Sequence, residues 1–72
     1  MKITAVYFRD RVAPPGLGMN AAESYLTIAQ GYAFEVEGGL VRIRREGKQP
    51  RLVPMSNVKW MDEEQLAPKG GK

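Results

Sequence analysis

Hydrophobic and polar side chains alternate regularly along two neighbouring segments of the chain, residues 32–37 and 40–45. Strict alternation of this kind is typical of a β-strand that buries one face. The Gly38-Gly39 pair between the two segments suits a tight two-residue turn. The pattern therefore predicts a β-hairpin.

Charged residues on the outward face of this hairpin support the same pairing. Glu35 and Glu37 would lie opposite Arg42 and Arg44. Cross-strand pairs of opposite charge contribute about 0.2–1 kcal/mol each. The charged positions and the hydrophobic positions thus predict the same pairing register for the two strands.

Further short strands are predicted on both sides of the hairpin. Residues 2–8 are rich in β-branched and aromatic side chains on both faces, which indicates a buried strand or one at an interface. Residues 51–54 form a strand that Pro54 ends. Residues 55–57 suit a tight turn of the 3₁₀ type, and residues 58–61 a last strand.

The segment before the hairpin fits two patterns. Asn20-Ala21-Ala22-Glu23 resembles a helix N-cap with an acidic residue three places on. Tyr25-Leu26-Thr27-Ile28 instead has the composition of a strand. We favour a strand over residues 25–29 preceded by a single helical turn, and a short helix around residues 21–30 is the alternative.

These elements predict a mainly β fold of about five strands, a small antiparallel barrel that is partly open. We expect a single domain over residues 1–66, with a mobile loop over residues 9–24 and a disordered tail at residues 67–72. Residues 62–64 would begin a frayed helical turn.

Composition limits how such a small domain is stabilised. The chain has 72 residues with neither Cys nor His, which removes disulfides and the commonest metal ligands. A domain of this size buries only about 60% of its unfolded surface. A compact core, or assembly with a partner or with further copies of itself, must therefore stabilise it.

No segment predicts a membrane or export signal. The apolar run near the start is interrupted by Arg9-Asp10-Arg11, too early for a signal peptide. No stretch approaches the roughly 20 apolar residues that span a bilayer. We expect a soluble, cytoplasmic protein, located in the host cytoplasm if it is phage-encoded.

The run Leu52-Val53-Pro54-Met55-Ser56-Asn57-Val58-Lys59-Trp60-Met61 resembles the end of an SH3-type barrel. There a strand, a 3₁₀ turn carrying Pro-Ser-Asn-Tyr and a short final strand follow one another. Here Met55 is inserted after Pro54, and Val58 replaces an aromatic residue of the family's peptide groove. The resemblance implies an SH3-like fold without recognition of Pro-rich peptides. The segment is also similar in style to small accessory proteins of tailed bacteriophages.

Catalytic chemistry has no candidate in this sequence. Hydroxyl side chains are present, but no His or Cys accompanies them as base or nucleophile. Ser56 next to Asn57 suits a turn. The acidic residues 62–64 are consecutive, so their side chains would not converge on one cation. We expect neither an enzyme nor a bound metal or cofactor.

Three surfaces remain for binding. The first is the basic hairpin, five cations within ten residues, namely Arg42, Arg44, Arg45, Lys48 and Arg51. A two-stranded ribbon of this kind fits the DNA major groove. It could equally contact an acidic protein surface, or be a solvated face that prevents edge-to-edge aggregation.

The second surface involves Trp60 and Met61. Strict alternation places Val58 and Trp60 on one face, and Lys59 and Met61 on the other. A single Trp in a small domain is usually part of the core, which would leave Met61 exposed. An outward Trp60 would instead be typical of a protein-interface anchor.

The third surface is the loop over residues 11–20, which contains Pro14, Pro15, Leu17 and Met19. The loop could dock on a partner and become ordered there, or fold back over one end of the barrel.

We therefore expect a non-enzymatic accessory or regulatory module that binds a larger protein assembly. In a phage context its target would be host machinery such as RNA polymerase or a nuclease complex. The alternatives are a nucleic-acid-binding barrel that uses the basic hairpin, and a structural subunit of the virion. Formation of a homo-oligomer is compatible with each of these three functions.

Overall fold

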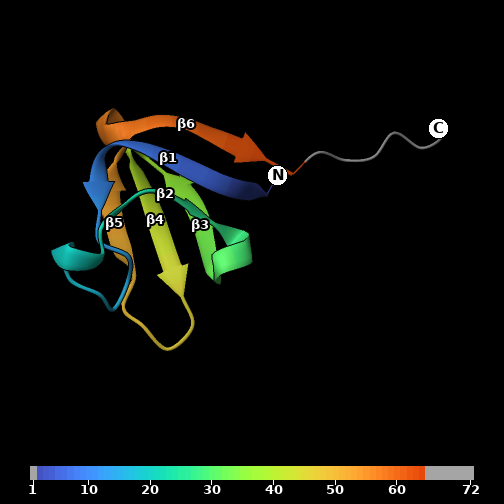
Figure 1. Cartoon of the computed structure of the whole chain (residues 1–72). Coiled ribbons are helices and arrows are strands. Elements are labelled where there is room, and N and C mark those ends of the chain that lie inside the picture. Colours follow the sequence, from blue (N-terminus) through green and yellow to red (C-terminus); the bar gives the residue numbers. More distant parts are fainter. Residues whose placement is uncertain (1, 65–72) are drawn as a thin grey trace.

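The computed structural model of the chain describes residues 2–64 and consists of strands joined by short turns (Figure 1). The strands are β1 (Ile3–Val12), β2 (Glu23–Thr27), β3 (Tyr32–Glu37), β4 (Leu40–Arg45), β5 (Arg51–Pro54) and β6 (Val58–Glu63). The 3₁₀ turns are η1 (Met19–Ala21), η2 (Ile28–Gln30) and η3 (Met55–Asn57). The predicted tail, residues 67–72, lies outside the described residues.

The six strands form two antiparallel sheets of three, with strand orders β2-β1-β6 and β3-β4-β5. The predicted mainly β, antiparallel class is confirmed. The predicted count of five strands is too low, and the strands form two separate sheets rather than one barrel. The strand favoured over residues 25–29 is confirmed as β2, which begins at Glu23 and ends at Thr27.

The hydrophobic core lies between the two sheets. Four of its side chains are at most 1% exposed: Val6, Leu26, Val41 and Ile43. Around them pack Phe8, Val12, Tyr32, Phe34, Val53 and Val58. In residues 2–64 no polar or charged side chain is buried, so core formation leaves no desolvated polar side chain to be satisfied.

The segment around β2 is a strand because Leu26 pairs with Val6 of β1 and both side chains enter the core. Only the single 3₁₀ turns η1 and η2 flank it, so the alternative of a short helix over residues 21–30 is wrong. Burial of Leu26 thus overrides the local capping signal. The described part of the chain contains no helix long and apolar enough to cross a membrane.

The predicted hairpin forms β3 and β4, in the predicted register, with Glu35 opposite Arg42. The φ angle of Gly38 is +63°, whereas the φ angle of Gly39 is not positive. This combination matches a type II′ turn. Arg42 Nη atoms lie 3.7 Å from Glu35 and 3.8 Å from Glu37, and Arg44 lies 3.5 Å from Glu35. These pairs are exposed, and each contributes at most about 1 kcal/mol.

The two outer strands extend further than predicted. β1 continues to Val12, whose side chain is buried. β6 continues to Glu63 because it remains paired with β1 as far as Ile3. The predicted frayed helical turn at residues 62–64 is therefore wrong.

The η3 turn confirms the predicted 3₁₀ segment and is bound to β1 by the side chain of Asn57. Asn57 Oδ1 accepts a hydrogen bond from the Asp10 backbone N–H at 2.8 Å. Asn57 Nδ2 donates to the Asp10 carbonyl oxygen at 3.0 Å. This pair of bonds holds the end of sheet β3-β4-β5 against sheet β2-β1-β6.

Replacing Ile43 by alanine should lower the free energy of unfolding by about 3 kcal/mol, because the lost side chain leaves a cavity in the core. Leu52→Ala is the matched control: Leu52 lies in the neighbouring strand but is 51% exposed, and its truncation should cost less than about 1 kcal/mol. Urea unfolding followed by circular dichroism measures both. Equal losses would contradict this placement of the core.

Replacing Asn57 by alanine should cost about 1–2 kcal/mol, because both hydrogen bonds to Asp10 are lost. Ser56→Ala, an exposed neighbour in the same turn, should stay within about 0.5 kcal/mol of the wild type. Thermal and urea unfolding compare the two variants. A loss in Ser56→Ala as large as in Asn57→Ala would show that the turn, and not the Asn57 side chain, is what matters.

Candidate functional site

Three aromatic rings form a row across the sheet β2-β1-β6, on the face directed away from the core. Tyr7 in β1 pairs in register with Tyr25 in β2 and with Trp60 in β6. The Tyr7 and Tyr25 ring centroids lie 5.2 Å apart with planes at 14°, and those of Tyr7 and Trp60 lie 4.8 Å apart with planes at 35°. We call this row the aromatic stripe.

A β-bulge in β6 places Trp60 in this row. Tyr7 pairs with Trp60 and the next residue, Phe8, pairs with Val58, so β6 contains one extra residue at this point. Val58 is consequently buried while Trp60 is 52% exposed. Strict alternation, which placed Val58 and Trp60 on one face, is wrong here for this reason.

The same bulge reverses the expected position of Met61. Met61 pairs with Val6 and packs partly buried against the core. The prediction that a core Trp60 would leave Met61 exposed is therefore reversed: Trp60 is outside, and Met61 faces inward.

The aromatic stripe is exposed to solvent and flanked by one cation and one anion. Trp60 and Tyr25 are 52% and 45% exposed. Lys59 Nζ lies 5.5 Å from the Trp60 ring centroid, a cation–π arrangement. On the other side the Asp62 carboxylate lies close enough to Tyr7 to act on its phenol.

The surroundings of Tyr7 favour its neutral phenol. Desolvation in the row of rings, and then the negative charge and hydrogen bond of Asp62, raise the pKa of Tyr7 above its ordinary value of 10.0. The phenol proton is therefore retained on Tyr7.

The sequence indicated Trp60 as a candidate but missed Tyr7 and Tyr25. Both tyrosines lie in segments whose strand composition is visible in the sequence. Their alignment with Trp60 depends on the register of three strands distant in sequence. No local pattern shows such a register.

The cations of the predicted basic hairpin do not form one common surface. Arg42 and Arg44 face the glutamates of β3. Arg45 lies over the Tyr32 ring, 5.3 Å from its centroid, and donates to the Tyr32 hydroxyl at 3.2 Å. These three arginines thus have partners within the hairpin itself.

The other two cations contact the loop between β1 and β2. Arg51 donates to the Leu17 carbonyl oxygen at 3.4 Å. The aliphatic chain of Lys48 crosses Gly16, where a Cβ atom would lie 2.7 Å from Lys48 Cδ and where φ is +81°. A glycine is therefore required at this position, and the basic hairpin and the loop are packed together.

The two halves of the loop over residues 11–20 match different predicted alternatives. Pro14 and Pro15 are less than 2% exposed, so this half folds back onto the domain. Leu17 and Met19 are 46% and 66% exposed and face outward. Loop mobility stays a prediction.

Within residues 2–64 no three His, Cys, Asp or Glu side chains are grouped so as to hold a metal ion. Asp62 and Glu63 lie in the extended strand β6, where successive side chains point to opposite faces. Asp62 accordingly contacts Tyr7, and Glu63 lines a groove on the other side of the strand.

Comparison with known proteins shows no match to any protein-family model, curated protein or solved structure. The functional assignment therefore depends on the chemistry of these surfaces.

Replacing Asp62 by asparagine should lower the pKa of Tyr7 towards 10.0, because the neighbouring negative charge is removed. Absorbance at the tyrosinate band during alkaline titration measures this, and Tyr7→Phe assigns the signal. The raised folded-state pKa contributes stability that is present below pH 10.0 and lost as the pH rises through the folded value. The fall in stability at alkaline pH should thus be smaller in Asp62→Asn. An unchanged Tyr7 titration would contradict the contact.

Proposed function

We propose that this chain is a non-enzymatic protein-binding module that attaches to a larger assembly through its aromatic stripe. The observation that supports this most directly is the exposure of Trp60 and Tyr25 beside Tyr7 on one sheet face. Tyr and Trp are the residues most enriched among the few side chains that dominate binding energy at protein interfaces. Their rings bury a large area while losing little rotamer freedom.

The geometry of the rings favours a protein partner over nucleic acid. Bases bind aromatic side chains by stacking on an exposed ring face. The faces of Tyr7 are turned towards Tyr25 and Trp60, and Lys59 lies over the Trp60 ring. The faces of the central ring are therefore less available to a base, and the O–H and N–H groups of the rings suit hydrogen bonds to a protein surface.

The charges around the aromatic stripe also favour a mainly apolar partner. Lys59 and Asp62 beside the stripe have opposite signs, so these two charges offset one another. The affinity of apolar docking changes little with salt concentration, whereas the affinity for phosphates falls steeply as salt rises.

Nucleic-acid binding by the basic hairpin is the second candidate, and it receives less support. Five cations lie close together in sequence, but the arginines contact Glu35, Glu37, Tyr32 and Leu17. Binding phosphates would require these contacts to break. A structural role in a virion is a third candidate, but no particular surface of the described residues supports it.

We further propose that the domain is distantly SH3-like and phage-encoded, acting on host machinery. The order β5, η3, β6 is compatible with the end of an SH3-type barrel. The two separate sheets of three strands depart from such a barrel. This part of the proposal depends mainly on the C-terminal sequence segment.

Trp60→Ala should abolish capture of the partner, with at least a tenfold loss (about 1.4 kcal/mol) because an anchor residue is removed. The experiment is an affinity capture from the native host with nuclease present, comparing wild type, Trp60→Ala and Leu52→Ala. Leu52 is equally exposed but lies in the other sheet, so its variant should retain the partner. Tyr25→Ala is a second test if Trp60→Ala is unstable.

Proteins that the Trp60 and Tyr25 variants lose and Leu52→Ala retains would support the proposal. Proteins held equally by all variants would overturn it. Material lost on nuclease treatment, and lost when Arg44 and Arg45 are replaced by glutamate, would favour nucleic-acid binding instead.

A further inference from the structure

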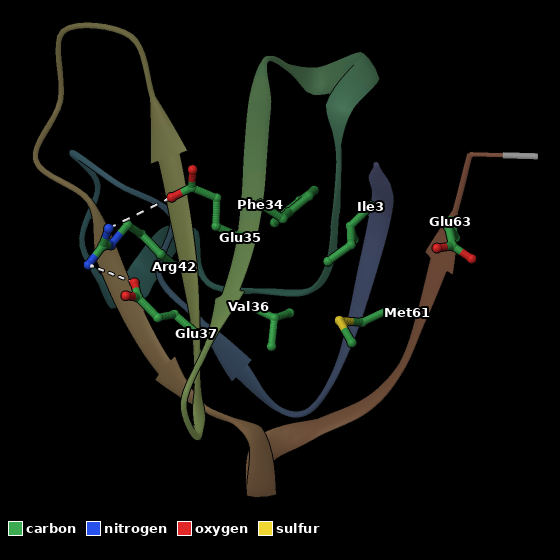
Figure 2. A pocket seen from close by; sticks show the side chains of 8 residues that line it. All are labelled: Ile3, Phe34, Glu35, Val36, Glu37, Arg42, Met61 and Glu63. Atoms are coloured by element: carbon green, nitrogen blue, oxygen red, sulfur yellow. Dashed lines mark ion pairs between the residues drawn. The ribbon is translucent and has the colours of Figure 1, made fainter. Parts of the chain in front are cut away.

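An open groove with a volume of about 870 Å³ runs along the free edge of β3 (Figure 2). Its apolar wall has Phe34 and Val36 from β3 on one side, and Ile3 of β1 and Met61 of β6 on the other. Val36 is 45% exposed, although alternation along β3 places it on the same face as the buried Phe34. Tyr32 and Phe34 remain buried, so the core side of β3 is uncovered at Val36.

The backbone of β3 has unpaired hydrogen-bonding groups along this groove. β3 is an edge strand that pairs only with β4. Residues that flank a two-residue turn exchange hydrogen bonds, so Glu37 and Glu35 direct their N–H and C=O groups towards β4. Phe34 and Val36 direct theirs to the open side, where another strand can pair with them.

The outer side of the same edge is acidic. Glu35, Glu37 and Glu63 line the groove together with a single cation, Arg42. Arg42 is already shared between Glu35 and Glu37 at 3.7 and 3.8 Å. Glu35 also lies 3.5 Å from Arg44 of β4, so the carboxylates here exceed the guanidinium groups by one (three against two), in a chain with a net charge of +3.

We propose that this edge accepts an extended segment of a partner protein in which Arg or Lys alternates with Val or Ile. Strand addition would satisfy the free backbone groups of β3. Apolar side chains of the segment would then face Phe34, Val36 and Met61, and its basic side chains would stand beside Glu35 and Glu37. Alternation is required because successive side chains of a strand point to opposite faces.

Strand β4, which pairs with the opposite edge of β3, has this same alternation of apolar and basic residues. β4 runs Val41-Arg42-Ile43-Arg44, with Val41 and Ile43 in the core and the two arginines against the β3 glutamates. An incoming segment would repeat these contacts on the opposite edge. The site uses neither Trp60 nor Tyr25, so it is independent of the aromatic stripe.

Charge argues against a second copy of this chain as the occupant. Antiparallel pairing of β3 with its own copy would bring the glutamates of both strands together on one face. Like charges on neighbouring strands destabilise a sheet. A basic segment from a different protein avoids this repulsion.

The test measures binding of a fluorescein-labelled octapeptide of alternating valine and arginine to the full chain by fluorescence anisotropy. It should bind about tenfold more tightly than a peptide of alternating valine and glutamate, and than one with its valines and arginines in separate blocks. The protein variant Val36→Pro, which removes an outward N–H, should weaken binding about tenfold. Val36→Ala keeps that N–H and is the matched control, with at most about a threefold loss.

The combined variant Glu37→Lys and Glu63→Lys gives a second measure if Val36→Pro does not fold, and it should also weaken binding about tenfold. Trp60→Ala should leave the peptide affinity unchanged, which separates this site from the aromatic stripe. Equal affinity for the three peptides, or unchanged affinity in Val36→Pro, would overturn the proposal. A wild-type dimer in sedimentation equilibrium that Val36→Pro dissociates would also overturn it, because the edge would then bind a second copy.

Discussion

Packing of the sheet β2-β1-β6 against the sheet β3-β4-β5 is the interaction on which the rest of this domain depends. The chain has no Cys and no His, so neither a disulfide nor a histidine-bound metal connects the sheets. Val6 and Leu26 of one sheet meet Val41 and Ile43 of the other, at 0–1% exposure. In a domain this small, burial of these few side chains is the main favourable term in folding.

The bulge in β6 links this packing to the aromatic stripe on the outer face. The extra residue opposite Tyr7 and Phe8 lets Val58 fill the core while Trp60 emerges on the outer face. Without it, alternation would bury both residues or expose both. Bulges commonly redirect a side chain in this way, and here the redirected residue completes the row with Tyr7 and Tyr25.

The cations of the basic hairpin are mostly used within the domain. The arginines of β4 neutralise the glutamates of β3 and cover Tyr32, and Lys48 and Arg51 contact the loop around Gly16 and Leu17. A cluster of cations in sequence is therefore not a cationic surface in space. The two surfaces proposed for partners are the aromatic stripe and the free edge of β3, where carboxylates exceed cations.

Local patterns alone determined much of this fold. Alternation, the Gly38-Gly39 turn and the matched charges predicted the β3–β4 hairpin in its observed register, because each of these signals acts between neighbouring residues. The η3 turn followed in the same way from the Pro-Met-Ser-Asn composition. The tertiary structure decided the rest: that residues 23–27 form a strand through burial of Leu26, that β6 contains a bulge, and that Tyr7, Tyr25 and Trp60 align. These features depend on contacts between strands far apart in the chain, and a one-residue change in such a register moves a side chain to the other face of the sheet.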